Sequence, residues 1–189
     1  MFKEFLFWSI GKNKLNEIYS NLNLQFYLGL VNYGMWIYLG FVSYVLIYAK
    51  PSLFWNLLIA VILGEVLEKI LKKLNWWKRP CYELTGKVPV GFLKAWYTNG
   101  SFPSGHTLKA VYYFIYLLAQ PVFSLPVFLL MSICLIAIRI YVGLHYPIDV
   151  LGGVILGVFV WYISSRFVSP EIVTNLVSQL IHFLTPLSI

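Results

Sequence analysis

The sequence predicts an all-α fold: an integral membrane helical bundle with five to six transmembrane helices. Hydrophobic residues make up 60% of the chain and charged residues only 11%, whereas a soluble domain carries roughly 45–50% and about 25%. Mean hydropathy is correspondingly high, at +0.77. A soluble protein of 189 residues could not cover so much apolar surface. The composition therefore excludes a soluble nucleic-acid-binding domain, a disordered chain and a fibrous repeat.

A transmembrane helix needs about 20 mostly apolar residues, and five segments are candidates, of which the third is short unless it is lengthened at one end. In chain order they cover approximately Phe26–Ala49, Leu53–Leu71, His106–Ala119, Val122–Leu144 and Pro147–Phe167. Tryptophan and tyrosine gather at the ends of these segments, as they do in interfacial belts. Most of these aromatic side chains, Trp76 and Trp77 among them, are therefore expected to be lipid anchors.

The remaining segments complete a single predicted membrane-embedded domain, residues 1–189. Residues 1–22 mix apolar side chains with lysine and glutamate and are expected to form an interfacial amphipathic helix. Residues 170–189 are expected to form an interfacial tail. The connection over residues 72–103 is long, and long connections are often functional. With five spans, it lies on the same membrane face as the turn at residues 144–147.

Basic and small residues on this face predict a site for a tetrahedral anion. Lys72, Arg79 and Arg139 supply fixed positive charge, and an arginine side chain presents a fork of donors that matches phosphate oxygens. Ser104 is a natural N-cap for the third apolar helix, whose first N–H groups would attract an anion. Gly105 would let a bound group approach the backbone closely.

Histidine is scarce, and Asp149 is the only aspartate in the chain. Pro147 suits the first turn of the fifth helix, which places Asp149 where it can accept a hydrogen bond from the His145 ring. A carboxylate behind an imidazole selects its tautomer and stabilises its developing charge. His145 is therefore the candidate nucleophile, and His106 is the candidate donor of a proton to the leaving oxygen.

Each feature taken alone has a structural alternative. Lys72 and Arg79 could be interfacial anchors whose charged ends reach toward lipid headgroups, and Asp149 could simply complement a helix dipole. Arg139 could pair with Glu65 or Glu68 inside the bundle. The order, spacing and common face of the three clusters favour the functional interpretation.

Two glutamates in the second segment are expected to be structural. Glu65 and Glu68 can each pair with a lysine four residues further on, at Lys69 and Lys72. Lys109 has two open interpretations: it could reach a second phosphate or a headgroup, or it could extend toward the interface without binding a ligand.

Three motifs resemble the tripartite signature of the type-2 phosphatidic acid phosphatase family. They are Lys72-x6-Arg79-Pro80, Pro103-Ser104-Gly105-His106 and Arg139-x5-His145-x3-Asp149. The resemblance implies a core like that of acid phosphatases and vanadium haloperoxidases. One departure is Ile138, which stands before Arg139 where the family usually has serine.

The same resemblance implies a role for each matched residue. The phosphate would be held by Lys72, Arg79, Ser104, Gly105 and Arg139. His145 would form a phosphohistidine intermediate with support from Asp149. His106 would protonate the leaving group and then assist the attacking water. No metal and no other cofactor is implied.

The resemblance further implies a metal-independent hydrolase that acts on a bacterial envelope lipid in the inner membrane, with its site facing the periplasm or exterior. Lipid A 1-phosphate or undecaprenyl diphosphate is the favoured substrate. Phosphatidylglycerophosphate and phosphatidic acid are alternatives, with specificity expected in residues 81–102. The expected partners are the lipid phosphate and the bilayer, with no nucleic acid and no obligate protein partner. A phosphate or lipid transporter, and phosphoryl transfer to an acceptor other than water, are the rival functions.

Overall fold

The computed structural model describes residues 2–49, 51–86, 100–119 and 124–167, and six isolated positions beyond them, 171, 175, 176, 178, 179 and 183. The prediction of an all-α protein is confirmed, because none of these described residues lies in a strand. The helices are α1 (Phe2–Leu6), α2 (Lys12–Ser20), α3 (Leu22–Ala49), α4 (Pro51–Lys73), α5 (Pro80–Thr85), α7 (Gly105–Ala119), α8 (Leu125–Tyr141) and α9 (Pro147–Ser164).

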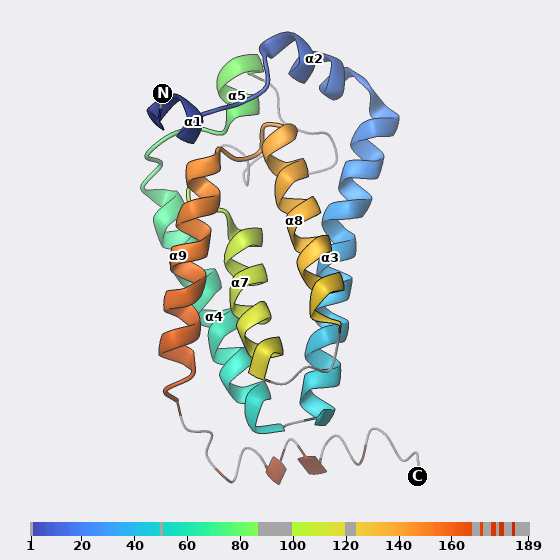
Figure 1. Cartoon of the computed structure of the whole chain (residues 1–189), viewed down its shortest axis with the longest axis vertical. Helices are drawn as coiled ribbons and strands as arrows, with labels where there is room; N and C mark the ends of the chain where they lie inside the picture. Colours follow the sequence, from blue (N-terminus) through green and yellow to red (C-terminus); the bar gives the residue numbers. More distant parts are fainter. Residues whose placement is uncertain are drawn as a thin grey trace.

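Five long helices, one from each predicted apolar segment, run along the length of the molecule, and the short helices α1, α2 and α5 lie together at one end (Figure 1). Helix α7 is central and packs against α4, α8 and α9. Its buried Leu108, Tyr112 and Leu117 meet Leu57 of α4 and Val160 of α9 in the main core. The core therefore holds α7 by its whole length, and this fixes the position of its first turn.

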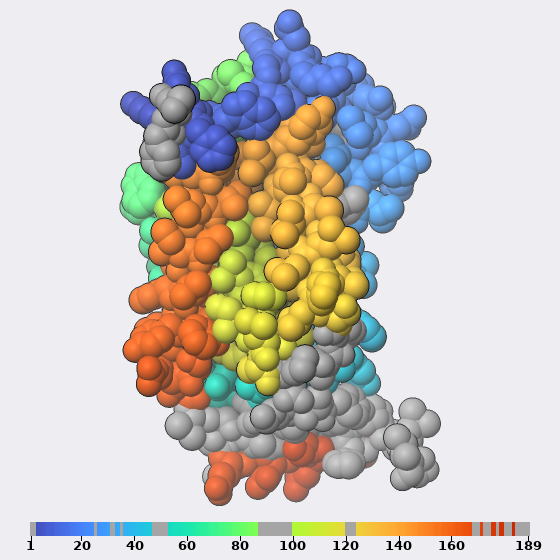
Figure 2. All heavy atoms as spheres, in the orientation of Figure 1, coloured from blue at the N-terminus to red at the C-terminus, as the bar shows by residue number. Residues whose placement is uncertain are grey.

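Helix α9 approaches α7 closely because two glycines face it. A Cβ added to Gly153 would lie 2.7 Å from the Ser104 carbonyl oxygen, and one added to Gly157 would lie 2.8 Å from the Leu108 carbonyl oxygen. Contacts this short leave no room for a side chain. On the face shown in Figure 2, side chains of α7 are visible between those of α8 and α9.

The outer surface of the bundle is strongly apolar. Large exposed side chains include Ile37 of α3, Leu130 of α8 and Ile155 of α9. Within the described ranges, α9 is the one helix that is long and apolar enough to cross a bilayer, and Trp36–Leu46 and α8 are shorter apolar helices. The number of membrane spans therefore stays a prediction.

The N-terminal segment forms two short helices instead of the single one predicted over residues 1–22. Helix α2 is amphipathic, and it buries Leu15, Ile18 and Tyr19 against Cys81 and the turn that follows α8. The Tyr19 hydroxyl donates to the Val142 carbonyl oxygen across 2.6 Å. Figure 2 shows α1 and α2 over the end of the bundle. One side of this segment therefore packs on the bundle, and the other side is exposed. Apart from isolated positions, the predicted tail over 170–189 lies outside the described residues.

Candidate active site

The turn between α8 and α9 brings Arg139 and His145 together. Gly143, with φ of +70°, adopts the left-handed conformation that glycine favours. Its N–H donates to the Ile140 carbonyl oxygen at 3.0 Å, and the Leu144 N–H donates to the Arg139 carbonyl oxygen at 2.9 Å. This pair of bonds is the Schellman motif that ends a helix. The Arg139-x5-His145 spacing is therefore a helix terminus that folds the histidine back beside the arginine.

The predicted contact between His145 and Asp149 is present, and both side chains are fully buried. His145 Nδ1 lies 3.4 Å from Asp149 Oδ2, which also accepts the Tyr146 backbone N–H at 2.8 Å. The other carboxylate oxygen, Oδ1, accepts the Trp77 indole N–H at 2.9 Å. A carboxylate oriented in this way favours the tautomer that carries its proton on Nδ1, which leaves the lone pair on Nε2.

Trp77 is a site residue that the sequence analysis missed. Its position at the end of an apolar segment indicated a lipid anchor, and no local pattern links it to a carboxylate 72 residues further on. In the structure the indole packs edge-on against Phe7 and Phe102, at centroid distances of 5.2 and 5.3 Å. Trp77 therefore connects the aromatic cover of the site to Asp149.

Two buried guanidinium groups surround Nε2 of His145. Arg79 Nη1 lies 3.4 Å from this nitrogen and donates to the Leu144 carbonyl oxygen at 3.0 Å. Arg139 Nη2 also lies 3.4 Å from His145 Nε2, while its Nη1 lies 3.4 Å from His106 Nε2. The alternative in which Arg139 pairs with Glu65 or Glu68 is therefore wrong.

The backbone around Arg79 explains how it reaches this turn. Arg79 is extended because it precedes Pro80, which occupies the first position of α5. The next residue, Cys81, donates its N–H to the Gly143 carbonyl oxygen at 2.8 Å. The first motif is thus bonded directly to the turn that carries the third.

The surroundings of His145 favour its neutral imidazole. Burial, followed by the charges of Arg79, Arg139 and Lys72, lowers the pKa of His145 well below its ordinary value. A neutral imidazole is the form that has a free electron pair on Nε2. The surrounding cations therefore favour the nucleophilic form of this side chain.

The N-terminus of α7 supplies the second motif. The predicted N-cap position of Ser104 is confirmed, because α7 begins at Gly105 and Leu108 donates its N–H to the Ser104 carbonyl oxygen at 3.0 Å. Ser104 also donates its own N–H to the Asp149 carbonyl oxygen at 2.9 Å, which ties the start of α7 to the start of α9. His106 in this first turn consequently faces Arg139, with Trp36 edge-on at a centroid distance of 6.1 Å.

Lys72 contacts the Glu68 carboxylate, as the sequence predicted. Glu65 differs from expectation, because it pairs with Lys109 at 2.7 Å instead of with Lys69. Lys109 also contacts Glu68, at 3.0 Å. Its ammonium group is therefore held by two carboxylates of α4.

The structure brings together all of the site residues that the sequence predicted. Direct contacts link His106, Arg139, His145, Asp149 and Arg79. Ser104 joins them through its backbone, and Lys72 joins them through Glu68, whose carboxylate lies against Gly105. Of the loop predicted to hold specificity, residues 87–99 lie outside the described ranges.

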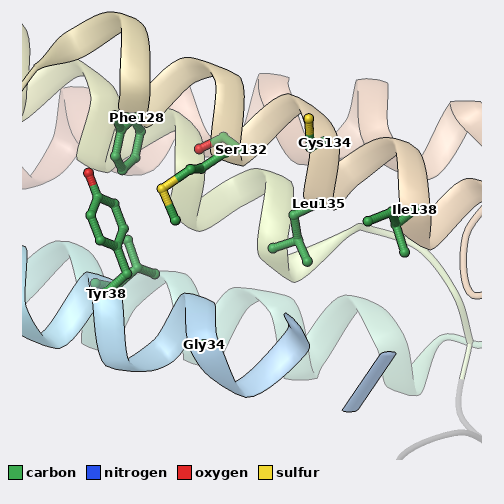
Figure 3. A pocket seen from close by; sticks show the side chains of 9 residues that line it. Gly34, Tyr38, Phe128, Ser132, Cys134, Leu135 and Ile138 are labelled. Atoms are coloured by element: carbon green, nitrogen blue, oxygen red, sulfur yellow. The ribbon is translucent and has the colours of Figure 1, made fainter. Parts of the chain in front are cut away.

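An apolar cavity of about 340 Å³ lies between α3 and α8 (Figure 3). Its lining is Gly34, Tyr38, Leu39, Phe128, Met131, Ser132, Cys134, Leu135 and Ile138. Ile138, which departs from the family pattern, thus lines this cavity and immediately precedes Arg139. The lining of the cavity therefore extends along α8 as far as the residue before Arg139.

Comparisons with known proteins place the chain in a family. The fold and the site define one class of protein. It is an all-α bundle in which a histidine–carboxylate pair faces two guanidinium groups at one end. The chain belongs to the PAP2 superfamily, whose sequence profile matches residues 53–172. The resemblance to type-2 phosphatidic acid phosphatases is therefore confirmed.

Two relatives illustrate the similarity. A Sulfolobus acidocaldarius protein named undecaprenyl-diphosphatase is 29% identical over 117 residues, which cover 60% of this chain and 52% of the relative. A Bacillus licheniformis protein named bacitracin transport permease protein BcrC is 32% identical over 151 residues, which cover 77% of this chain and 71% of that protein. The chain thus aligns with about half the length of the Sulfolobus relative. No solved structure matches the chain significantly.

Proposed function

We propose that this protein is an integral membrane lipid phosphatase that works through a phosphohistidine intermediate. The observation that carries the proposal is the setting of His145, whose Nδ1 faces Asp149 while Nε2 faces Arg79 and Arg139. A nucleophilic nitrogen between two phosphate-binding guanidinium groups is suited to in-line attack on phosphorus.

The reaction has two balanced steps. The electron pair of His145 Nε2 forms a bond to the terminal phosphorus, and the bond from this phosphorus to the bridging oxygen of the lipid phosphate breaks with its electron pair on that oxygen. His106 gives this oxygen a proton. Water then attacks the phosphohistidine and loses a proton to His106, and the P–N electron pair returns to Nε2 as phosphate leaves. Asp149 stabilises the positive charge that the His145 ring carries in between.

Charge stabilisation comes from protein groups in this proposal. Arg79, Arg139 and Lys72 would neutralise the oxygens of the transferring phosphoryl group, and the first N–H groups of α7 would add to their effect. As the family resemblance implies, the proposed hydrolase is independent of metal ions, with these cationic side chains supplying the positive charge.

The substrate in this proposal is a lipid diphosphate with a long isoprenoid chain, such as undecaprenyl diphosphate. The name of the Sulfolobus relative supports this class over lipid A 1-phosphate and the glycerophospholipids. The apolar cavity between α3 and α8 extends as far as Ile138, the residue before Arg139, and in this proposal it takes the hydrocarbon chain. Helices α3, α4, α7, α8 and α9 would cross the cytoplasmic membrane, with the site at its outer face.

A phosphate-release assay on the purified full chain in detergent tests this function. The panel holds undecaprenyl diphosphate, lipid A 1-phosphate, phosphatidylglycerophosphate and phosphatidic acid, each with and without EDTA. We expect the isoprenoid diphosphate to react fastest and EDTA to change nothing. His145→Ala and His106→Ala should each abolish release while the protein remains folded. Full activity in a folded His145→Ala protein would end the nucleophile assignment.

Transport remains the rival function, and the name of the Bacillus relative keeps it in view. Transporter sites generally lie near the middle of the membrane between repeats. The site described here lies toward the end of the bundle that carries α5 (Figure 1). A reconstituted protein that moves lipid phosphate across vesicles without releasing phosphate would favour transport over the proposed hydrolysis.

A further inference from the structure

The carboxylate of Glu68 occupies the space that Gly105 leaves open at the start of α7. A Cβ added to Gly105 would collide with both carboxylate oxygens of Glu68. One of these oxygens contacts the Lys72 ammonium, and the other lies 3.0 Å from Lys109. The Glu68 side chain is only 12% exposed. A negative group is therefore already bound between a signature lysine and the N-terminus of a helix.

This position has the properties of an anion site. Lys72 provides a positive charge, the first N–H groups of α7 provide a positive dipole end, and Gly105 provides room. A substrate phosphate that bound Lys72 and the start of α7 would meet the Glu68 carboxylate at close range. Like charges this close in a poorly solvated site repel strongly.

We propose that Glu68 is a displaceable internal counter-ion. Its carboxylate occupies the phosphate position in the free enzyme and releases Lys72 when the substrate phosphate binds. This inference rests on the proposed function, because it assumes that Lys72 binds the phosphate. On binding, the Lys72–Glu68 ion pair is exchanged for a Lys72–phosphate pair. On product release the carboxylate returns and helps to expel phosphate.

Lys109 makes the exchange possible. It contacts both Glu68 and Glu65, and its side chain is 5% exposed. When Glu68 releases Lys72, its carboxylate therefore still has a buried cation as partner. An unpaired buried carboxylate would be strongly destabilising, so a partner retained throughout the exchange lowers its cost. In this proposal Lys109 holds the displaced carboxylate.

A purely structural role for Glu68 predicts the opposite change in phosphate affinity. If Glu68 only positions Lys72, its neutralisation leaves the lysine misplaced and weakens phosphate binding. If Glu68 competes with phosphate, its neutralisation removes the competitor and strengthens binding. The direction of the change in affinity therefore separates the two roles.

The test is the affinity of the purified full chain for inorganic phosphate, measured by calorimetry in detergent. We expect Glu68→Gln to bind phosphate about tenfold more tightly than the wild type. Glu65→Gln is the matched control, since it also removes one carboxylate from Lys109 but leaves the Lys72–Glu68 ion pair in place, and its affinity should change much less than that of Glu68→Gln. In a Lys72→Met background, Glu68→Gln should bring no gain, because no lysine remains to be released.

A second variant covers the case in which Glu68→Gln fails to fold. Glu68→Asp keeps the negative charge for Lys109 but withdraws the carboxylate from Gly105, so it should tighten phosphate binding by a smaller factor. Phosphate binding that is unchanged or weaker in the folded Glu68 variants would overturn the displacement and leave the phosphate site intact. Failure of every protein, wild type included, to bind phosphate would overturn the proposed site and the displacement together.

Discussion

Trp77 donates its indole N–H to Oδ1 of Asp149 across 2.9 Å, although the two residues are 72 positions apart in the chain. The second carboxylate oxygen faces the His145 ring. An aromatic side chain from the connection after α4 thus helps to set the plane of the carboxylate that orients the proposed nucleophile. The cover of the site and its chemistry are therefore coupled through one hydrogen bond.

Replacement of Trp77 by phenylalanine should slow turnover with little change in KM. The substitution keeps an aromatic ring against Phe7 and Phe102 and removes the donor. A hydrogen bond to a charged acceptor contributes about 1.5–3 kcal/mol, so kcat should fall about tenfold or more. Steady-state phosphate release measures this. The control is Trp76→Phe, at a more exposed ring, and its kcat should equal that of the wild type. An unchanged kcat in Trp77→Phe would refute the coupling.

Replacement of Arg139 by lysine should be far from conservative. Arg139 reaches both proposed catalytic histidines with separate nitrogens, which a single ammonium cannot do. We expect kcat/KM to fall about 100-fold, or ~2.7 kcal/mol of transition-state stabilisation. The control is Arg166→Lys, at an exposed arginine that contacts Tyr162. A variant with near-normal kcat/KM would show that one positive charge is sufficient there.

Gly157→Ala should destabilise the bundle. Its Cβ would lie 2.8 Å from both the Leu108 carbonyl oxygen and the Val111 Cβ, so α7 and α9 would have to separate. Overpacking of this kind costs about 1–3 kcal/mol, which should lower the thermal midpoint in detergent by about 3–10 °C. Gly40→Ala meets nothing within 4 Å and should leave the midpoint unchanged or slightly higher. Equal midpoints for the two variants would contradict the close helix contact.

The His145 imidazole should remain neutral when the pH falls through about 6.5, the ordinary histidine value. Its pKa is lowered by burial and by Arg79, Arg139 and Lys72. Nitrogen NMR of histidine-labelled protein measures this, with His145→Gln to assign the signal. Arg79→Gln should raise the pKa, because it removes a neighbouring cation.

The same shift has a consequence for stability. The unfolded chain takes up a proton on His145 near pH 6.5, whereas the folded chain does so only at lower pH. The contribution of this histidine to stability is therefore complete above about pH 6.5 and is lost as the pH falls below it. The acid-induced loss of stability should be smaller in His145→Gln. An equal loss in both proteins would show that His145 titrates normally in the folded state.

The sequence by itself determined the helical class and indicated which residues form the proposed site. Each of the five apolar segments forms a long helix, because an apolar run and its end signals act locally. Gly143, Pro147 and Asp149 place the third motif through contacts within six residues, at the end of one helix and the start of the next. Such short-range geometry can be predicted from spacing alone.

Only the tertiary structure decided which distant side chains meet. Trp77 reaches Asp149, and Glu65 pairs with Lys109 instead of with the lysine four residues away. The N-terminal segment forms two helices, which lie near α5. The place of the Glu68 carboxylate against Gly105 is of the same kind. Each depends on how α4, α7 and α9 pack, since packing brings together residues that no local periodicity relates.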